Sequence, residues 1–246
     1  ALISAGAAYI VTDAIDDADL LTVVEAAQDW PLLSGGSGVT AALAAIHYAG
    51  RSALNFDDRL RALPPATLVV SGSQSPMTRR QCEAALREGF AGFRLDVPAL
   101  LRGSFDGARL AAQARDVLSG GGHAIVYAPA EGPDFIRQTQ ALGASLGWDA
   151  VQTGERIAAA LADLARRLVN DGVVGRLVVS GGETSGAVCR ALDVRALQVG
   201  LPLAPGVPFC FPLDGRPLLL ALKSGNFGDE DLYAQVRSCG AGTRPR

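Results

Sequence analysis

The chain has 246 residues, of which 49% are hydrophobic and 19% are charged. This composition excludes a disordered protein and allows one large domain or two smaller ones, each with a buried core. The formal net charge of −3 argues against a broad nucleic-acid-binding surface, which is normally basic. No nucleic acid is therefore expected as a partner. No apolar run of about 18 residues is present, so no membrane is expected as a partner either.

Four cysteines, Cys82, Cys189, Cys210 and Cys239, are scattered along the chain without C-x-x-C spacing. They are expected to be reduced thiols of a cytoplasmic protein and not disulfides or zinc ligands. The N-terminal residues show no basic segment followed by an apolar core, so no signal peptide is predicted. The first residue is Ala1 and not Met, which suggests that an upstream segment has been removed.

The first part of the chain is expected to begin with a buried strand at Ala7–Val11, followed by a helix with acidic residues in its first turn. A second apolar run, Trp30–Leu33, leads into the glycine-rich loop 34–38 and a helix through Val39–Ala49. Residues 36–41 match the dinucleotide fingerprint G-x-G-x-x-A. No strand carrying an acidic residue follows, so dinucleotide binding is not favoured.

The charged stretch Arg51–Leu63 is interpreted as an irregular connection, because it lacks a clear period and ends in two prolines. We therefore divide the chain into residues 1–63 and residues 64–246. The second part alternates strands and helices, which is typical of a sheet covered by helices.

The pentad Leu-Val-Val-Ser-Gly occurs at 68–72 and again at 177–181, and each copy turns through serine and glycine into a helix. The other expected elements are strands at Gly92–Val97, His123–Ala128, Ala196–Val199, Val207–Phe211 and Leu218–Leu222, helices at Phe105–Leu118, Thr153–Val169 and Leu232–Val236, and a less regular stretch at Pro129–Gly147. This order predicts an α/β fold with a parallel or mixed sheet and helices on both faces. Ligands of such sheets bind at the carboxyl ends of strands, where we expect loops 34–38, 71–75 and 180–186.

The segment Ser180–Gly186 combines a strand end, paired glycines and the start of a helix. Ser180 and Glu183 have the S-x-x-E spacing of a capping box. Glycine lets backbone amides approach a ligand, and a helix N-terminus carries partial positive charge, so this segment is a candidate phosphate site. We expect Gly182 to adopt a positive φ. The alternative is a tight strand-to-helix connection without a ligand.

Several other residues allow both a functional and a structural interpretation. Lys223 lacks the glycine frame of a Walker A motif, and it either balances phosphate charge or is a solvated lysine at a strand end. The acids Asp229–Asp231 could bind Mg²⁺, but the dipole of the helix that they open also explains them. His47 and His123 are expected to be structural or surface histidines. Glu183 either contacts a metal or a nucleotide hydroxyl or only caps its helix.

Three segments together resemble the four-carbon acid sugar kinase family, the ATP-dependent kinases of tetronate-type sugar acids. They are Val70–Gln81, Ser180–Leu192 and the stretch from Leu203–Pro208 to Leu222–Asp231. Leu32–Gly38 also resembles the passage between the two domains of that family. The resemblance covers essentially the whole chain and implies a nucleotide-binding C-terminal domain at 64–246, preceded at 1–63 by the tail of a substrate domain.

The resemblance also implies the residues of the site. ATP phosphates would be contacted by the following residues: Ser73, with Ser71 and Ser75 as alternatives, then Gly181, Gly182, Glu183 and Thr184, and finally Gly225. Mg²⁺ would bridge the phosphates during transfer of the γ-phosphoryl group to a hydroxyl of the sugar acid. The family often has Cys where this chain has Gln74, a difference that backbone contacts should tolerate.

The family's N-terminal motif, Asp-Asp-Leu-Thr-Gly-Ala, is absent, since Asp16-Asp17 is followed by Ala18-Asp19. Because that domain is thought to supply the catalytic aspartate and hold the sugar acid, we expect the catalytic residue outside this chain and the chain alone to be inactive. The alternatives are a non-catalytic nucleotide- or phosphate-sensing module and a sugar-phosphate isomerase-like protein. The sugar acid itself and the oligomeric state, a homo-oligomer included, stay open.

Overall fold

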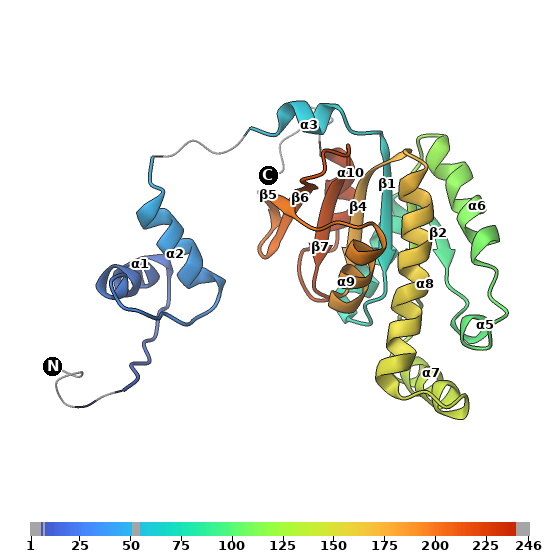
Figure 1. Ribbon diagram of the computed structural model, residues 1–246, viewed down its shortest axis with the longest axis horizontal. Helices are drawn as coiled ribbons and strands as arrows, with labels where there is room; N and C mark the ends of the chain where they lie inside the picture. Colours follow the sequence, from blue (N-terminus) through green and yellow to red (C-terminus); the bar gives the residue numbers. More distant parts are fainter. Residues whose placement is uncertain (1–5, 7, 51–54, 240–246) are drawn as a thin grey trace. The chain divides into compact units, whose positions relative to one another are not determined.

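A computed structural model describes residue 6 and residues 8–50 and 55–239 (Figure 1). The chain divides into two compact units, Ala1–Leu54 and Asn55–Arg246. Within the described residues, no helix combines the length and the apolar character that crossing a membrane requires.

The described part of the first unit contains two helices, α1 (Asp17–Ala27) and α2 (Ser37–His47), that pack against each other. Asp16 begins α1 by accepting a 3.0 Å hydrogen bond from the Asp19 amide. Gly38 permits a close approach of the helices, because a Cβ there would lie 2.8 Å from Leu20 Cδ1.

The strand predicted at Ala7–Val11 is wrong for the described residues 8–11, where Tyr9 and Val11 are 92% and 94% exposed. A strand needs a neighbour for its amides and carbonyls, and none of the described residues of this unit forms one. For the same reason loop 34–38 does not follow a strand, and the G-x-G-x-x-A match covers only the start of α2.

The second unit contains a seven-stranded sheet with the order β2-β3-β1-β4-β7-β6-β5. The first five strands in this order, β2, β3, β1, β4 and β7, are parallel to one another. The strands β6 and β5 continue the sheet beside β7 as an antiparallel hairpin. The strands are β1 (Ala66–Ser71), β2 (Ala91–Arg94), β3 (Ala124–Tyr127), β4 (Val174–Ser180), β5 (Leu197–Ala204), β6 (Val207–Pro212) and β7 (Leu219–Lys223). The central strands β1 and β4 are buried along their whole length, as strands covered on both faces must be.

Helices cover both faces of this sheet, which confirms the predicted fold class. Two layers of core residues lie on the two faces of the sheet. Along β1 the residues alternate between them, since Leu68 and Val70 belong to one core cluster and Val69 to the other. The first layer packs under α5 (Val97–Leu101), α6 (Gly107–Ser119), α8 (Ala150–Asn170) and α9 (Gly182–Ala191). The second packs under α4 (Pro76–Arg87) and α10 (Leu232–Ser238).

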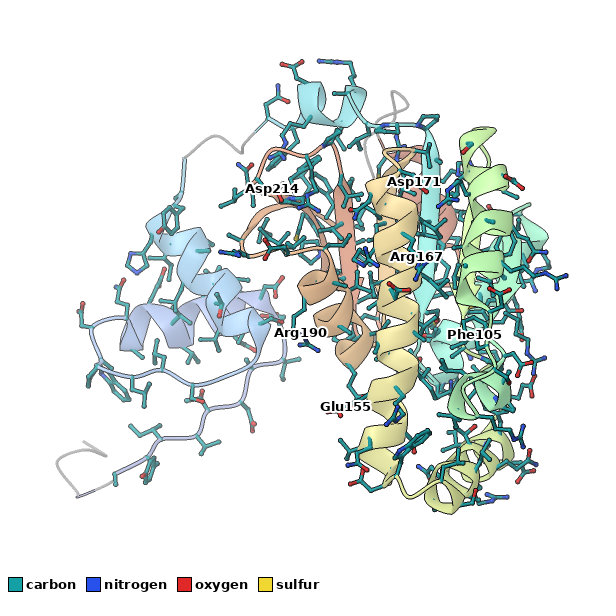
Figure 2. All side chains as sticks on the ribbon, turned by 45° about the vertical axis from the view of Figure 1, so that its right-hand side comes forward. Phe105, Glu155, Arg167, Asp171, Arg190 and Asp214 are labelled. Carbon is teal, nitrogen blue, oxygen red and sulfur yellow. The ribbon has the colours of Figure 1, made fainter. Side chains whose placement is uncertain are left out.

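The longest helix, α8, crosses the first face of the sheet (Figure 2). It starts with a complete capping box, in which Asp149 and Gln152 accept each other's amide hydrogens. Leu161, Leu164 and Leu168 form its buried stripe, as the sequence predicted. Near its other end Asp171 forms an ion pair with Arg115 of α6.

The stretch predicted to be irregular at Pro129–Gly147 instead contains α7 (Pro133–Ser145), which packs against α5 and α8. Gly132, at φ 92°, begins this helix, and proline occupies its first turn, where a missing amide hydrogen costs little. Strand β2 is also shorter than predicted, because Val97 already belongs to α5.

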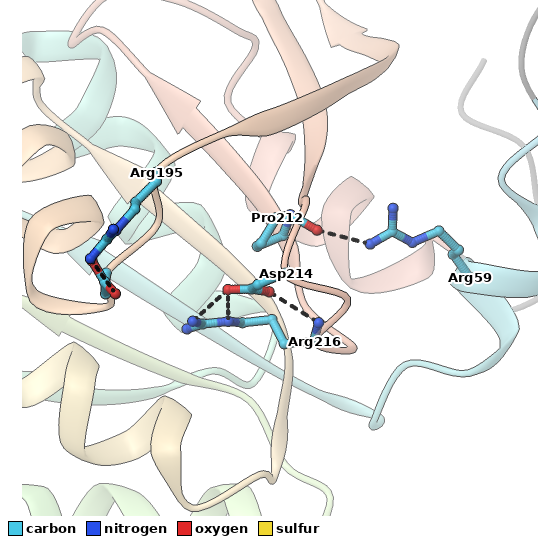
Figure 3. Close-up of polar contacts among 6 residues, drawn as sticks. Arg59, Arg195, Pro212, Asp214 and Arg216 are labelled. Atoms are coloured by element: carbon cyan, nitrogen blue, oxygen red, sulfur yellow. Dashed lines mark hydrogen bonds and ion pairs between the residues drawn. The ribbon is translucent and has the colours of Figure 1, made fainter.

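A short helix, α3 (Asp57–Arg61), lies within the connection predicted to be irregular and packs on the β5–β6 hairpin. The Phe56 ring stacks on Phe211, with centroids 5.7 Å apart. The Arg59 guanidinium lies 4.2 Å from the same ring and donates a 3.2 Å hydrogen bond to the Pro212 carbonyl oxygen (Figure 3). These contacts explain why the compact second unit begins at Asn55, while residues 51–54 lie outside the described residues. The assignment of 1–63 to a substrate domain stays a prediction.

Candidate functional site

Three loops meet at the carboxyl end of the sheet. Ser71, Ser180 and Lys223 end the parallel neighbours β1, β4 and β7 and stand opposite one another in the register. We call the segments that follow them the β1 loop (72–75), the β4 loop (181–184) and the β7 loop (224–228). The expectation that loops 71–75 and 180–186 lie at strand ends is therefore confirmed.

The β1 and β7 loops are joined by direct hydrogen bonds. The Ser75 hydroxyl, which caps α4 by accepting the Thr78 amide, also donates to the Gly225 carbonyl oxygen at 2.5 Å. Thr78 Oγ1 lies 2.8 Å from the same oxygen and 3.2 Å from Ser73 Oγ. A Cβ at Gly225 would lie 2.6 Å from Ser73 Oγ, so this close approach requires glycine. The predicted residues Ser73, Ser75 and Gly225 are thus brought together.

The β4 loop is fixed by Gly181, whose φ of 112° favours glycine. Its amide donates a 3.0 Å hydrogen bond to the Lys223 carbonyl oxygen. A Cβ at Gly181 would lie 3.3 Å from the Ser73 amide nitrogen, which places the β4 loop against the β1 loop. The positive φ predicted for Gly182 is wrong, since the strained position is one residue earlier.

The predicted capping box of Ser180 and Glu183 is also wrong. The N-cap of α9 is Gly181, which has no side chain, and the Ser180 hydroxyl lies 2.6 Å from the Tyr233 hydroxyl beneath the sheet. Ser180 is the last residue of β4, so the alternation of the strand directs its side chain to the face that α10 covers. Ser71 ends β1 on the same face and is 1% exposed, so its hydroxyl lies below the loop.

The N-terminus of α9 is left open toward the loops. Its first amides, at Gly182, Glu183 and Thr184, have no acceptor within the helix, as in any α-helix, and carry partial positive charge. A Cβ on Gly182 would meet no atom within 4 Å, so there is free space beside these amides. This arrangement suits an anion such as a phosphate.

A pocket of about 190 Å³ adjoins the β1 and β4 loops. Its walls combine apolar side chains from α7 and α8 with a few polar groups. It is lined by Gly72, Gln74, Val97, Ala128, Phe135, Ile136, Thr139, Gln140, Ala150, Thr153, Gly154, Ile157, Ala158, Glu183 and Thr184. Such a pocket next to an anion site has the character of a small-molecule site.

Sequence reasoning missed the α7 side of this pocket because Pro129–Gly147 was expected to be irregular. The available signal was Gly132-Pro133 at a helix start, followed by Phe135, Ile136 and Leu142, which pack toward the core or the pocket.

Gln81 was missed as well, although it is fully buried. Its side-chain amide donates to the carbonyl oxygens of Phe227, Gly228 and Asp229 at 3.1, 3.1 and 2.8 Å, and so holds the end of the β7 loop. The signal was the spacing of Ser75, Thr78 and Gln81, which places three polar residues on one face of α4.

The other ambiguous residues are now placed. Lys223 is 1% exposed, so its interpretation as a solvated lysine is wrong. The acids Asp229–Asp231 are exposed, Glu230 pairs with Arg80 at 2.8 Å, and the described residues contain no group of three His, Cys, Asp or Glu side chains arranged to hold a metal. His47 is exposed, and half-buried His123 accepts a 3.2 Å hydrogen bond from the Thr67 amide.

Comparison with known proteins agrees with this geometry. Residues 68–233 match the family described as the nucleotide-binding C-terminal domain. The 3-oxo-tetronate kinase of Cupriavidus necator is 39% identical over 96% of this chain and 53% of its own length. The 3-oxo-isoapionate kinase of Paraburkholderia graminis is 37% identical over 83% of this chain and 45% of its own length.

A crystal structure of a Haemophilus influenzae protein matches with a TM-score of 0.71 and 31% identity, over 97% of this chain and 55% of that one. The chain thus spans about half the length of the relatives that it matches. Together these matches show that it belongs to the four-carbon acid sugar kinase family and carries its nucleotide-binding C-terminal domain.

Proposed function

We propose that this chain is the nucleotide-binding part of an ATP-dependent kinase that phosphorylates a four-carbon sugar acid of the threonate, erythronate or 3-oxo-tetronate type. The observation that carries the proposal is the meeting of the three loops beside the open N-terminus of α9. The names of the relatives, 3-oxo-tetronate kinase and 3-oxo-isoapionate kinase, support a sugar acid as the phosphoryl acceptor.

In this proposal the phosphates lie over the loops. The amides of Gly182, Glu183 and Thr184 donate to phosphate oxygens, and the absence of a side chain at Gly182 leaves room for them. Ser73 and Gly225 form the facing wall. Phosphoryl transfer depends mainly on positioning and on charge neutralisation, which such a cradle of amides supplies.

The base of the nucleotide is assigned to the pocket between α7 and α8. Phe135, Ile136 and Ile157 offer apolar surface to a purine ring, while Gln140 supplies a donor and an acceptor for its polar edge. Glu183 belongs to the β4 loop and also lines the pocket, where a carboxylate can accept hydrogen bonds from ribose hydroxyls.

Mg²⁺ is also part of the proposal. When bound it would neutralise the charge of the phosphates. Mg²⁺ keeps several waters and binds substrate phosphates with one or two carboxylates, so it does not need an assembled cluster of protein ligands. The residues of the loops therefore fit a magnesium–nucleotide complex that supplies most of its own coordination.

By analogy with the relatives, the catalytic group and the sugar acid site are assigned to the half of their length that this chain does not match. Calorimetric titration of this chain with Mg·ADP tests nucleotide binding, and we expect saturable binding to one site. A chain that shows neither heat nor a thermal shift at millimolar Mg·ADP contradicts the proposal. Kinase activity is tested by joining this chain to such an N-terminal half and measuring sugar-acid-dependent ADP formation; a sensing module would form none.

A further inference from the structure

Lys223 is the only lysine in the sequence, and the other 21 basic residues are arginines. It ends β7 and is 1% exposed. Its ammonium donates to Thr78 Oγ1 at 3.1 Å and to the Gly225 carbonyl oxygen at 3.0 Å. No carboxylate of the described residues contacts it, so its charge lies in the protein without a countercharge. A buried charge in this situation is costly.

The other buried cation among the described residues, Arg176, also has no carboxylate partner, but it differs from Lys223 in its hydrogen bonding. Arg176, 5% exposed, lies in β4 near the opposite end of the sheet. Its guanidinium donates to the carbonyl oxygens of Pro64, Pro65 and Cys239, so its hydrogen-bonding groups are well used. An ammonium has three donors, and the protein accepts only two of those of Lys223 among the described residues.

One acceptor of Lys223, Gly225, belongs to the predicted phosphate site, and the other, Thr78 of α4, contacts a residue of that site. Gly225 is in the β7 loop, and Thr78 Oγ1 also contacts Ser73 Oγ of the β1 loop. The Lys223 carbonyl oxygen accepts the Gly181 amide of the β4 loop. One residue therefore touches or supports all three loops, and its uncompensated charge lies directly beneath them.

We infer that Lys223 is the positioning residue of the phosphate site: its ammonium holds the β7 loop against the β1 loop, and the phosphates of the nucleotide balance its buried charge. This inference rests on the proposed nucleotide binding. It goes further in assigning the site a buried, titratable cation that favours the bound anion only while it is protonated.

The surroundings of Lys223 allow this titration to be observed by itself. Burial lowers the pKa of Lys223 to about 8. The titratable groups facing it are Cys82 of α4, with a pKa raised by burial to about 11, and Tyr233 of α10, with a pKa also raised by burial. On this face the neighbouring strand β4 presents the neutral hydroxyl of Ser180 opposite Lys223, and its charged residue, Arg176, lies four residues earlier and bonds to backbone carbonyl oxygens there. Cys210 of β6 packs on the other face.

The remaining charged side chains nearby are on the surface. On α4 they are Arg79, Arg80, Glu83 and Arg87; after the β7 loop they are Asp229, Glu230 and Asp231; and on α10 Arg237 is half-buried and engages Glu88.

A nucleotide that binds the protonated form more tightly must raise the pKa of Lys223 in the complex. Affinity is then constant below about pH 8 and falls about tenfold per pH unit above it, until the pKa of the complex is reached. A lysine with a purely structural role would show neither effect.

Because the chain has one lysine, protein grown with lysine labelled with ¹³C at Cε gives a single side-chain signal that reports this site. We expect its midpoint near pH 8 in the free protein and at least about one unit higher with saturating Mg·ADP. Calorimetry of the wild-type chain between pH 7 and 10 should show the matching loss of affinity. Neither measurement depends on a variant that folds.

Variants then separate charge from structure. Lys223→Met keeps the apolar stem and should bind Mg·ADP at least about tenfold more weakly at pH 7, without pH dependence. Lys223→Arg keeps a charge that does not titrate, so it should bind more tightly than Lys223→Met and equally at pH 7 and 9.5. The matched control Arg176→Met removes the other buried cation and should leave both the affinity and its pH dependence unchanged.

A lysine midpoint that is the same with and without bound Mg·ADP overturns this inference alone. A wild-type chain that binds no Mg·ADP at pH 7 overturns the proposed function together with it.

Discussion

The hydroxyl oxygens of Ser180 and Tyr233 lie 2.6 Å apart, and both residues are fully buried between β4 and α10. This hydrogen bond connects the strand that leads into the β4 loop with the last helix of the unit. It also explains why the serine of an S-x-x-E sequence does not cap α9. The Ser180 hydroxyl bonds to Tyr233 beneath the loops and not to the first amides of α9, because burial leaves the Tyr233 hydroxyl in need of a partner.

Tyr233→Phe removes one partner of this bond and leaves the Ser180 hydroxyl buried without it. We expect the free energy of unfolding to fall by about 1–3 kcal/mol, measured by urea denaturation. The double variant Ser180→Ala with Tyr233→Phe removes both partners and should recover much of the loss. If the effects of the two single substitutions simply add, the two hydroxyls do not interact.

Gly182→Val should abolish Mg·ADP binding while leaving the free energy of unfolding nearly unchanged. Gly182 has ordinary backbone geometry and open space around it, so valine fits the fold but fills the space beside the first amides of α9. Gly181→Val is the contrasting variant, since its φ of 112° should cost about 1–3 kcal/mol of stability. Gly186→Ala, inside the helix, is the control that should keep both properties. Unchanged ADP affinity in Gly182→Val would show that the β4 loop is only a connection.

Gly154→Leu tests the pocket separately from the phosphate site. Gly154 lines the pocket from α8, so a leucine side chain should occupy the space assigned to the base, and helix propensity favours leucine over glycine. Affinity for ADP should fall at least about tenfold, or about 1.4 kcal/mol, while binding of inorganic pyrophosphate is kept. Ala159→Leu on an exposed position of the same helix is the matched control. Equal losses for ADP and pyrophosphate would contradict the assignment of the base.

The stability of the second unit should depend on pH through His123. Burial lowers the pKa of His123, and its Nδ1 must be unprotonated to accept the Thr67 amide. Below about pH 6.5 the unfolded chain takes up a proton that the folded chain resists, so the free energy of unfolding should fall as the pH decreases. His123→Asn should reduce this slope between pH 7 and 5, as measured by urea denaturation, while His47→Asn should not. An identical slope in His123→Asn and wild type would exclude this residue as the cause.

The isolated chain should not phosphorylate a tetronate. The reason is that the catalytic group is assigned to the half that the longer relatives contain and this chain does not match. A coupled assay for ADP in the presence of Mg·ATP and threonate, erythronate or a 3-oxo-tetronate should show no dependence on the sugar acid. Turnover that depends on the sugar acid would place a catalytic residue within these 246 residues.

The sequence alone was enough to predict those features that depend on residues close together along the chain. The runs 68–70 and 177–179 are β-branched or leucine throughout, and the serine and glycine residues after them end each strand at once. The buried stripe of α8 follows from a spacing of three and four residues. Strands that alternate with helices then lead to a sheet covered on both faces.

The tertiary structure decided which strand ends are neighbours. The sequence places Ser71 and Ser180 more than a hundred residues apart, and their pairing depends on how the whole sheet is ordered. It also decided the face toward which Ser180 points, and so removed the predicted capping box. The glycine with a positive φ is Gly181 and not the predicted Gly182, because pairing with β7 fixes the last residue of β4.

Lys223 is the clearest case of a residue whose role the local sequence left open and the tertiary structure decided. Its sequence context, a lysine and a serine after an apolar run, is equally typical of a solvated strand end and of an ion-binding loop. Only the packing of α4 and α10 on that face buries the ammonium and gives it Thr78 as a partner, whereas its contact with Gly225 is local. Burial is a property of surfaces contributed by residues far apart in the chain, so no local pattern around residue 223 could have revealed it.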